Sequence, residues 1–296
     1  MTISRVTQNM MMNRSQLALQ TGLSRLAKTQ EQLSTGRVLN RPSDSPTDTT
    51  SAMRMRASIA EQAQYKRNAQ DGLGWLGTID TELQSQLSQL RRASDIAIQG
   101  ANATSSSVQV REALAIEVDQ IRESLLAGAN TTYLGRPVFG GLTNTPGAYD
   151  DTGAFTGAPG EVTRTVGKDV KVRVNVDGPA VFGPPGADMF KNLENLSNAL
   201  RAGDAAGVQA SIGALSGDQT RITTALAEVG TRYNRLEQAV QKTVDTELSL
   251  SSTLSEVENV DLAKATLDLG LHEVAYQAAL ASTARLIQPS LVDFLR

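Results

Sequence analysis

Residues 222–240, ITTALAEVGTRYNRLEQAV, place apolar side chains at seven-residue intervals along two adjoining rows. Residues 73–90, LGWLGTIDTELQSQLSQL, repeat this spacing in the first half of the chain. The positions concerned are Leu76, Leu83, Leu90, Ile222, Leu226, Val229, Tyr233, Leu236 and Val240. A seven-residue apolar repeat keeps one seam of a helix facing a partner helix. The sequence therefore predicts a helical bundle core in which the first half of the chain packs against the second.

Both ends of the chain carry apolar stripes of the same kind. They run through Met12, Leu19, Leu26, Leu33, Leu262, Leu269, Tyr276, Leu286, Ile287, Leu291, Phe294 and Leu295. A long isolated helix is marginal in water unless its apolar face is covered, and a monomer has little left to cover these stripes. We therefore expect the terminal helices to form the subunit-assembly surface, and to order when subunits meet at a cost in conformational entropy.

The order of helix-forming and turn-forming residues predicts a mainly α fold with a small β-rich insert. Helical patterns cover residues 1–35, 48–100, 107–127 and 188–202, and then run to the C-terminus with breaks at Gly203, Gly217 and Asn259. Gly36 supplies a residue that tolerates positive φ at the end of the first helix. Asn40–Pro46, which contains two prolines, is expected to form the loop that follows.

The middle of the chain has a different composition. Six of the nine prolines and four of the five phenylalanines lie between Pro137 and Phe190. Residues 170–176 alternate valine with polar residues, which predicts a strand with one buried face, closed by a turn at Asp177–Pro179 and paired with residues 162–166. The predicted domains are a terminal assembly domain (1–45 plus 258–296), a helical bundle domain (46–134 plus 205–257) and a β-rich exposed domain (135–204).

Composition excludes several classes of function. The 28 basic and 31 acidic residues give a net charge of -3, so no broad basic surface for nucleic acid is expected. Cysteine is absent, which excludes disulfides, thiolate nucleophiles and cysteine-ligated metals. No stretch approaches the roughly 18 apolar residues of a membrane span, and the first residues lack the apolar core of a signal peptide. The sequence predicts a soluble protein that, if exported, leaves without a conventional cleaved signal.

Two motifs resemble ligand sites on paper. Gly72-Leu-Gly-Trp-Leu-Gly77 matches the dinucleotide fingerprint, but that fingerprint must follow a strand, and here it lies within a helical pattern. The glycines are therefore expected to permit close helix approach or a local bend. His272-Glu-Val-Ala-Tyr276 is half of a zinc-binding motif, with tyrosine where the second histidine is needed. Since His272 is the only histidine, neither a two-histidine zinc site nor a serine–histidine–aspartate triad on this helix is expected.

An acidic cluster, Glu256, Glu258 and Asp261, lies near an expected helix start. Acidic side chains there oppose the positive end of the helix dipole, so helix electrostatics accounts for the cluster without catalysis. No catalytic residue, cofactor site or metal site is predicted.

Several stretches together resemble the bacterial flagellin family. Gln32-Leu-Ser-Thr-Gly-Arg37 and Asn40-Arg-Pro-Ser-Asp-Ser-Pro46 are similar to its N-terminal signature, and Asn68-Ala-Gln-Asp-Gly-Leu-Gly-Trp-Leu76 to its next conserved helix. Glu256-Val-Glu-Asn-Val-Asp-Leu-Ala263 and Tyr276-Gln-Ala-Ala-Leu280 are similar to its C-terminal signature. The last residues, Ser290–Leu295, resemble the junction branch of the family more than flagellin itself.

The resemblance implies a structural subunit, not an enzyme, that joins the flagellar hook to the filament. Its implied partners are hook-associated protein 1 below, flagellin above, copies of itself in a ring, and an export chaperone that covers the C-terminal helix. Neither nucleic acid nor membrane is an expected partner. Family members pack their terminal helices inside a tube and leave through the flagellar export apparatus, so the resemblance places the chain outside the cell, in the flagellum, without a cleaved signal peptide.

Two alternatives remain at this point. The chain is flagellin, the filament polymer itself, or it is an enzyme or ligand-binding protein that uses the Gly-rich middle. A general coiled-coil scaffold does not explain the paired terminal signatures.

Overall fold

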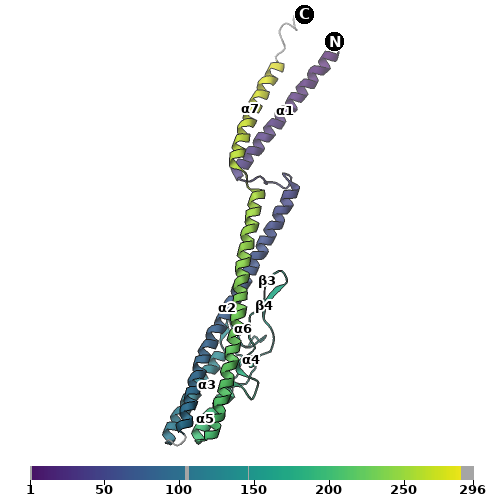
Figure 1. Ribbon diagram of the computed structural model, residues 1–296. Helices are drawn as coiled ribbons and strands as arrows, with labels where there is room; N and C mark the ends of the chain where they lie inside the picture. Colours follow the sequence, from purple (N-terminus) through teal and green to yellow (C-terminus); the bar gives the residue numbers. More distant parts are fainter. Residues whose placement is uncertain (1, 104–106, 146, 288–296) are drawn as a thin grey trace. The chain divides into compact units, whose positions relative to one another are not determined.

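The computed structural model describes residues 2–103, 107–145 and 147–287, and the side chains within them except those of 2–9, 103 and 285–287. The helices are α1 (Thr2–Thr35), α2 (Pro46–Ala103), α3 (Val108–Ala129), α4 (Gly178–Phe182), α5 (Met189–Ala202), α6 (Ala205–Glu258) and α7 (Leu262–Ile287). The strands are β1 (Thr132–Tyr133), β2 (Arg136–Pro137), β3 (Thr163–Gly167) and β4 (Val170–Arg173). The predicted assembly positions Leu286, Ile287, Leu291, Phe294 and Leu295 fall outside the described side chains. The mainly α fold with a small β-rich part is confirmed (Figure 1).

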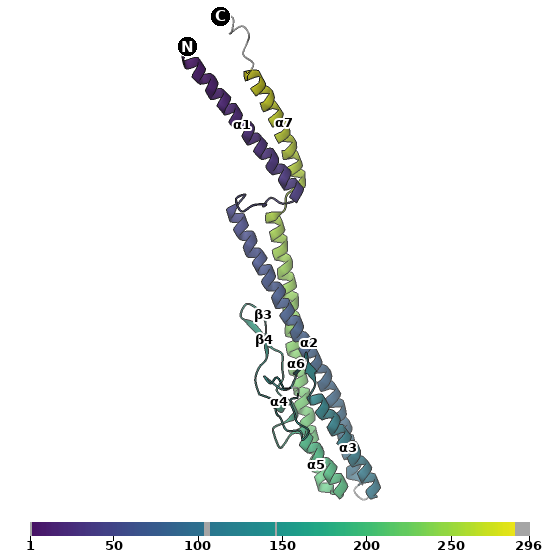
Figure 2. The same ribbon diagram turned by 180° about the vertical axis from the view of Figure 1, so that it is seen from behind.

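The chain divides into two compact units, Met1–Ala60 with Leu248–Arg296 and Glu61–Glu247. In the first, α1 and α7 from opposite ends of the sequence lie side by side (Figures 1 and 2). The boundaries at 60/61 and 247/248 fall inside α2 and α6, whereas the sequence placed them at 45/46 and 257/258. The predicted boundaries were placed at loop residues. In the structure, α2 and α6 each continue from one compact unit into the other, so the boundaries fall within helices.

The second unit is built on the seam between α2 and α6. Most of the predicted seam positions are buried, namely Leu76, Leu83, Leu90, Ile222, Val229 and Leu236, each 0% exposed. Leu226 and Val240, on the second row of α6, are partly buried against this core. Tyr233 was wrongly assigned to the core, because it is 38% exposed. Only the row 222–229–236 faces inward, and the adjoining row lies at its edge.

The β-rich stretch shares the core of the helical bundle instead of forming a domain of its own. Phe139 and Tyr149 pack in edge-on aromatic contacts with Phe182 and Phe190 of α4 and α5, at ring distances of 5.0–5.5 Å. These aromatics belong to the same buried cluster as Trp75 of α2. The predicted separate domain 135–204 is therefore wrong, since its phenylalanines are what attach it to the bundle.

The predicted hairpin is present but shorter than expected. β3 and β4 pair antiparallel, with Asp169 at φ 60° in the turn. Val172, Val174 and Val176 are buried as the alternation predicts, whereas Val170 is 41% exposed beside the turn. The predicted turn at 177–179 is instead the start of α4, with Pro179 in its first turn. Asn68 Nδ2 donates to the Thr165 carbonyl (2.8 Å), which ties the hairpin to α2.

Two of the three predicted helix breaks are confirmed. Gly203 ends α5 at φ 70°, and α6 ends just before Asn259. The break predicted at Gly217 is wrong, because α6 is continuous through it. A single glycine costs a helix only about 1 kcal/mol relative to alanine, less than the burial of neighbouring Leu215 and Ile222 contributes. Among the described helices, none combines the length and apolarity needed to cross a membrane.

Leu236 and Leu248 provide a matched pair on α6, since the first is 0% and the second 70% exposed. We expect Leu236→Ala to lower the free energy of unfolding by about 2–5 kcal/mol, because it leaves a cavity in the seam. Leu248→Ala should change it by less than about 0.5 kcal/mol. Urea unfolding of both variants checks this, and equal losses would contradict the proposed core.

Candidate assembly surface

The pair formed by α1 and α7 is held by small and half-buried side chains. A Cβ added at Gly22 of α1 would lie 3.4 Å from the Tyr276 ring of α7, so the two helices are in close contact there. Thr29 and Ala265 are the buried residues of this pair in the described part of the two helices, at 8% and 5% exposed. So little full burial gives the pair weak support of its own.

The predicted assembly positions are divided between the two sides of this pair. Leu19, Leu26 and Leu33 of α1 and Leu269 and Tyr276 of α7 are partly buried. Met12 and Leu262 are exposed, at 44% and 58%. Most of the described positions that the sequence predicts for subunit assembly are therefore partly covered within the chain itself.

Other large apolar side chains of α1 and α7, which are not among the predicted assembly positions, face outward. They are Met10, Met11, Leu17, Leu23, Leu267, Leu271, Val274 and Leu280. The signal that could have found part of this set is the i, i+4, i+7 spacing of Leu267, Leu271 and Val274. The pair thus exposes an apolar surface on both helices.

The two terminal signature segments meet in a backbone clasp, formed by residues 36–38 and 258–260. Val38 N donates to the Glu258 carbonyl (2.8 Å), and Val260 N donates to the Gly36 carbonyl (3.0 Å). Arg37 and Asn259 between them form an antiparallel bridge. Gly36, at φ 70°, adopts the left-handed conformation that lets the chain leave α1 and enter the clasp.

Charged side chains hold the segments on either side of the clasp. Arg56 of α2 pairs with Glu258 (2.7 Å), which is 7% exposed. Lys28 of α1 pairs with Asp44 (3.0 Å), whose other oxygen accepts from the backbone N–H of Arg41 (2.9 Å). The hydrogen bond from Lys28, followed by that from Arg41, lowers the pKa of Asp44 below its ordinary value. The proline-containing loop is thereby fixed as a defined turn between α1 and α2.

The acidic cluster has two different roles. Asp261 Oδ1 accepts from the backbone N–H groups of Ala263 (3.0 Å) and Lys264 (3.1 Å), which caps α7 as the helix-dipole reading predicts. Glu258 does not act there, because it is committed to Arg56.

The glycine motif lies inside α2 and serves packing. A Cβ at Gly72 would lie 2.8 Å from Leu236 of α6, and one at Gly74 would collide with the Tyr133 hydroxyl. The expectation of close helix approach is confirmed at Gly72, whereas the neighbour of Gly74 belongs to strand β1. His272 is partly buried in a groove between α1 and α7, and no group of metal-ligating side chains comes together in the described residues.

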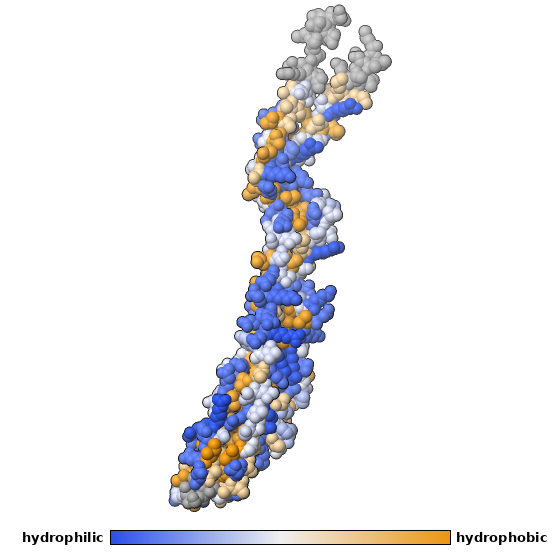
Figure 3. Space-filling model, viewed as in Figure 1, coloured by the Kyte–Doolittle hydropathy of each residue, from blue (hydrophilic) through white to orange (hydrophobic). Residues whose placement is uncertain are grey.

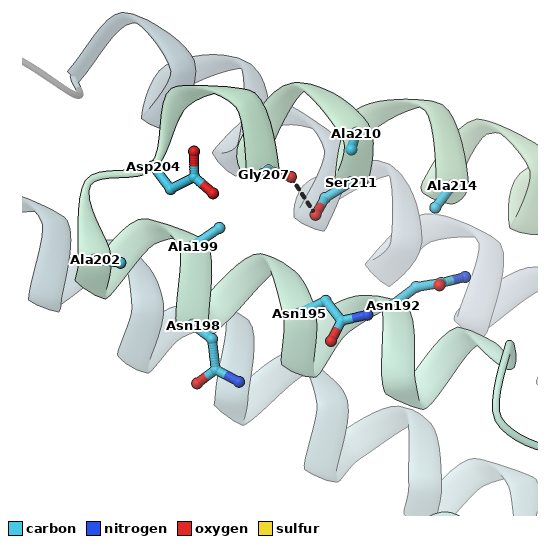
Figure 4. A pocket seen from close by; sticks show the side chains of 10 residues that line it. All are labelled: Asn192, Asn195, Asn198, Ala199, Ala202, Asp204, Gly207, Ala210, Ser211 and Ala214. Carbon is cyan, nitrogen blue, oxygen red and sulfur yellow. Dashed lines mark hydrogen bonds between the residues drawn. The ribbon is translucent and has the colours of Figure 1, made fainter.

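A groove with a volume of about 500 Å³ lies between α5 and α6. In Figure 4, the amide of Asn195 on α5 lies across from small residues of α6. Ser211 donates to the Gly207 carbonyl (2.9 Å), and Asp204 accepts from Ala206 N (3.0 Å). The hydroxyl and carboxylate here serve their own helix, so the groove presents hydrogen-bonding amides and no nucleophile–base pair among its described lining residues.

Beside this groove, Asp218 of α6 is a buried carboxylate, 1% exposed. Asn192 Nδ2 of α5 donates to it (2.9 Å), and Arg221 forms an ion pair with it. Burial raises the pKa of Asp218 to about 6, against the opposing effect of these two partners.

Models of one family match both ends of the chain. The bacterial flagellin N-terminal helical region matches residues 6–143, and the bacterial flagellin C-terminal helical region matches residues 212–295. The matched ranges contain the two segments that form the clasp.

Individual relatives belong to two kinds of flagellar protein. A flagellin of Halalkalibacterium halodurans is 26% identical over 87% of this chain and 86% of its own. Flagellar hook-associated protein 3 of Salmonella typhimurium is 23% identical over 93% of this chain and 94% of its own. In fold, the chain is similar to the solved flagellar junction protein FlgL of Legionella pneumophila, with a TM-score of 0.59 and 15% identity over 71% of this chain and 100% of that one.

Asp218 predicts a specific pH dependence of stability. Its folded-state pKa of about 6 lies above the ordinary 3.8, so the stability it contributes is present below about pH 4 and is lost as pH rises through about 6. Asp218→Asn cannot ionise and keeps an acceptor for Asn192, so we expect it to remove this part of the loss. Urea unfolding at about pH 4.5 and 7.5 measures the difference. Asp151→Asn, on an exposed loop, is the control; an unchanged pH profile in Asp218→Asn would contradict the assignment.

Proposed function

Because the chain belongs to the bacterial flagellin family, we propose that it is the structural subunit that joins the flagellar hook to the flagellin filament. The observation that carries the proposal is the antiparallel α1–α7 pair, built from both ends of the chain, with large apolar side chains left exposed on both helices. The likeness to hook-associated protein 3 over 93% of the chain supports the junction role.

The two compact units are proposed to have different roles, one in the stability of the subunit and the other in assembly. The buried seam around Leu83 and Val229 holds each subunit together, since a fully buried leucine contributes about 1.5–3 kcal/mol. The terminal helices bury little apolar surface within one subunit. Their apolar residues therefore contribute most to stability when neighbouring subunits cover them. Met12, Leu262 and the outward residues of α7 are proposed as contacts between subunits.

The partners follow from this position. Hook-associated protein 1 is proposed to lie on the hook side, flagellin on the filament side, and further copies of the chain beside it in a ring. During export, a chaperone is proposed to cover the exposed apolar side of α7, which includes Leu267 and Leu271. The proposed site of action is the extracellular flagellum, at the junction of hook and filament.

Flagellin itself is the second candidate, favoured by the 26% identity to the Halalkalibacterium flagellin. A filament protein and a junction subunit share the paired terminal helices, so the distinction lies in what each polymerises with. A junction subunit should not extend into a filament unaided.

Deletion of the encoding gene separates the two. For a junction subunit we expect cells that retain hooks, lack filaments and shed flagellin into the medium, as seen by electron microscopy and by assay of the medium. Re-expression of the chain should restore filaments. Normal hooks with no flagellin anywhere, in a strain able to export it, would instead identify the chain as the filament protein.

A further inference from the structure

Methionine is concentrated in the compact unit that contains α1 and α7. Six of the seven methionines lie within residues 1–60, and the seventh, Met189, is buried in the helical bundle at 0% exposed. Because cysteine is absent, these thioethers are the only sulfur atoms of the protein. Three of them, Met10, Met11 and Met12 of α1, form a methionine triplet whose side chains are 56%, 54% and 44% exposed. An oxidant that attacks sulfur therefore reaches the unit of the terminal helices and not the bundle core.

The methionine triplet lies on a part of α1 that this chain leaves largely uncovered. α1 and α7 lie further apart toward the N-terminus of α1 than beside the clasp (Figures 1 and 2). Met12 continues the seven-residue row of Leu19 and Leu26, which are partly buried, yet Met12 itself is exposed. Successive helical residues are about 100° apart, so Met10 and Met11 point to other sides of α1. The thioethers thus extend over much of the circumference of the helix.

Oxidation changes what these side chains can do in an interface. Methionine is unbranched and flexible, so it fills irregular gaps when another molecule covers it. The sulfoxide has the same skeleton but is polar. A polar group that is buried without a hydrogen-bond partner costs free energy. Sulfoxides on several sides of α1 therefore oppose the covering of this helix by neighbouring molecules.

We propose that the methionine triplet is an oxidation-sensitive site that controls incorporation of the free subunit into the flagellum, with a peroxide as the oxidant. The thioether sulfur attacks one oxygen of hydrogen peroxide, the O–O bond breaks, a sulfoxide forms and one water leaves. Sulfur loses two electrons and the peroxide gains them. Methionine sulfoxide reductases reverse the change. The proposal rests on the proposed junction function and adds a means of regulating it.

Mass spectrometry after brief treatment with dilute hydrogen peroxide tests the site itself. In the purified full chain, we expect the methionine triplet to be oxidised at least about tenfold faster than buried Met189, because susceptibility follows exposure. In isolated flagella the triplet should react at least about tenfold more slowly than in the free chain, because neighbours cover it. Equal rates in flagella and in the free chain would overturn the proposal and leave the junction role intact.

The effect on incorporation is measured by adding purified chain to cells that lack the gene and counting filaments by electron microscopy, each variant against its own untreated form. Met53 of α2, at 59% exposed, provides a matched control. Met10→Leu/Met11→Leu/Met12→Leu removes the triplet, and peroxide should then change the number of filaments by less than about twofold. Met53→Leu/Met55→Leu keeps the triplet and should lose filaments about tenfold on treatment, as the unchanged chain does.

Reduction provides a second readout that needs no substitution. Treating the oxidised, otherwise unchanged chain with the reductases for both sulfoxide epimers should restore the filaments. Equal losses in the two variants, or no recovery after reduction, would overturn the role of the methionine triplet. Untreated chain that restores no filaments would instead contradict the junction function, and with it the proposal that rests on it.

Discussion

The apolar seam between α2 and α6 is the interaction on which the rest of the structure depends. It brings Gly72 of α2 against Leu236 of α6, which are separated by well over a hundred residues of chain. Closing so long a loop costs only slightly more entropy than closing a shorter one, because the cost grows with the logarithm of length. The middle of the chain joins the same buried cluster through Phe139 and Phe190.

The burial of side chains changes sharply between the seam and the terminal helices. The seam excludes leucine and valine completely from solvent, whereas the α1–α7 pair is closed mainly by half-buried residues. The clasp lies where α1 ends and α7 begins, and it is held by backbone hydrogen bonds and the Arg56–Glu258 pair. It does not cover their apolar sides. Such a subunit can be stable in its helical bundle while its terminal helices gain most of their stability from neighbouring subunits. Figure 3 shows apolar and polar residues interspersed on one face of the molecule.

Much of the fold could be predicted because heptad spacing and helix-stopping glycines are local signals. Leu76, Leu83 and the end of α1 at Gly36 follow from them. The burial of Tyr233 could not be predicted, because α6 carries two adjoining apolar rows with the same spacing. The sequence does not say which row faces the partner helix. The same ambiguity hid the outward-facing apolar residues of α7, because α7 is apolar on two sides and periodicity does not say which side stays within the chain. The clasp joins residues 36–38 to 258–260, and no local pattern predicts such a pairing.

The most direct measurement is amide hydrogen exchange, followed by mass spectrometry, on the purified monomer and on assembled flagella. The account predicts that in the monomer the amides of α1 and α7 exchange much faster than those around Leu83 and Val229, and that assembly protects them. Strong protection of both terminal helices in the monomer, equal to that of the seam, would show that they need no neighbour and would contradict the account.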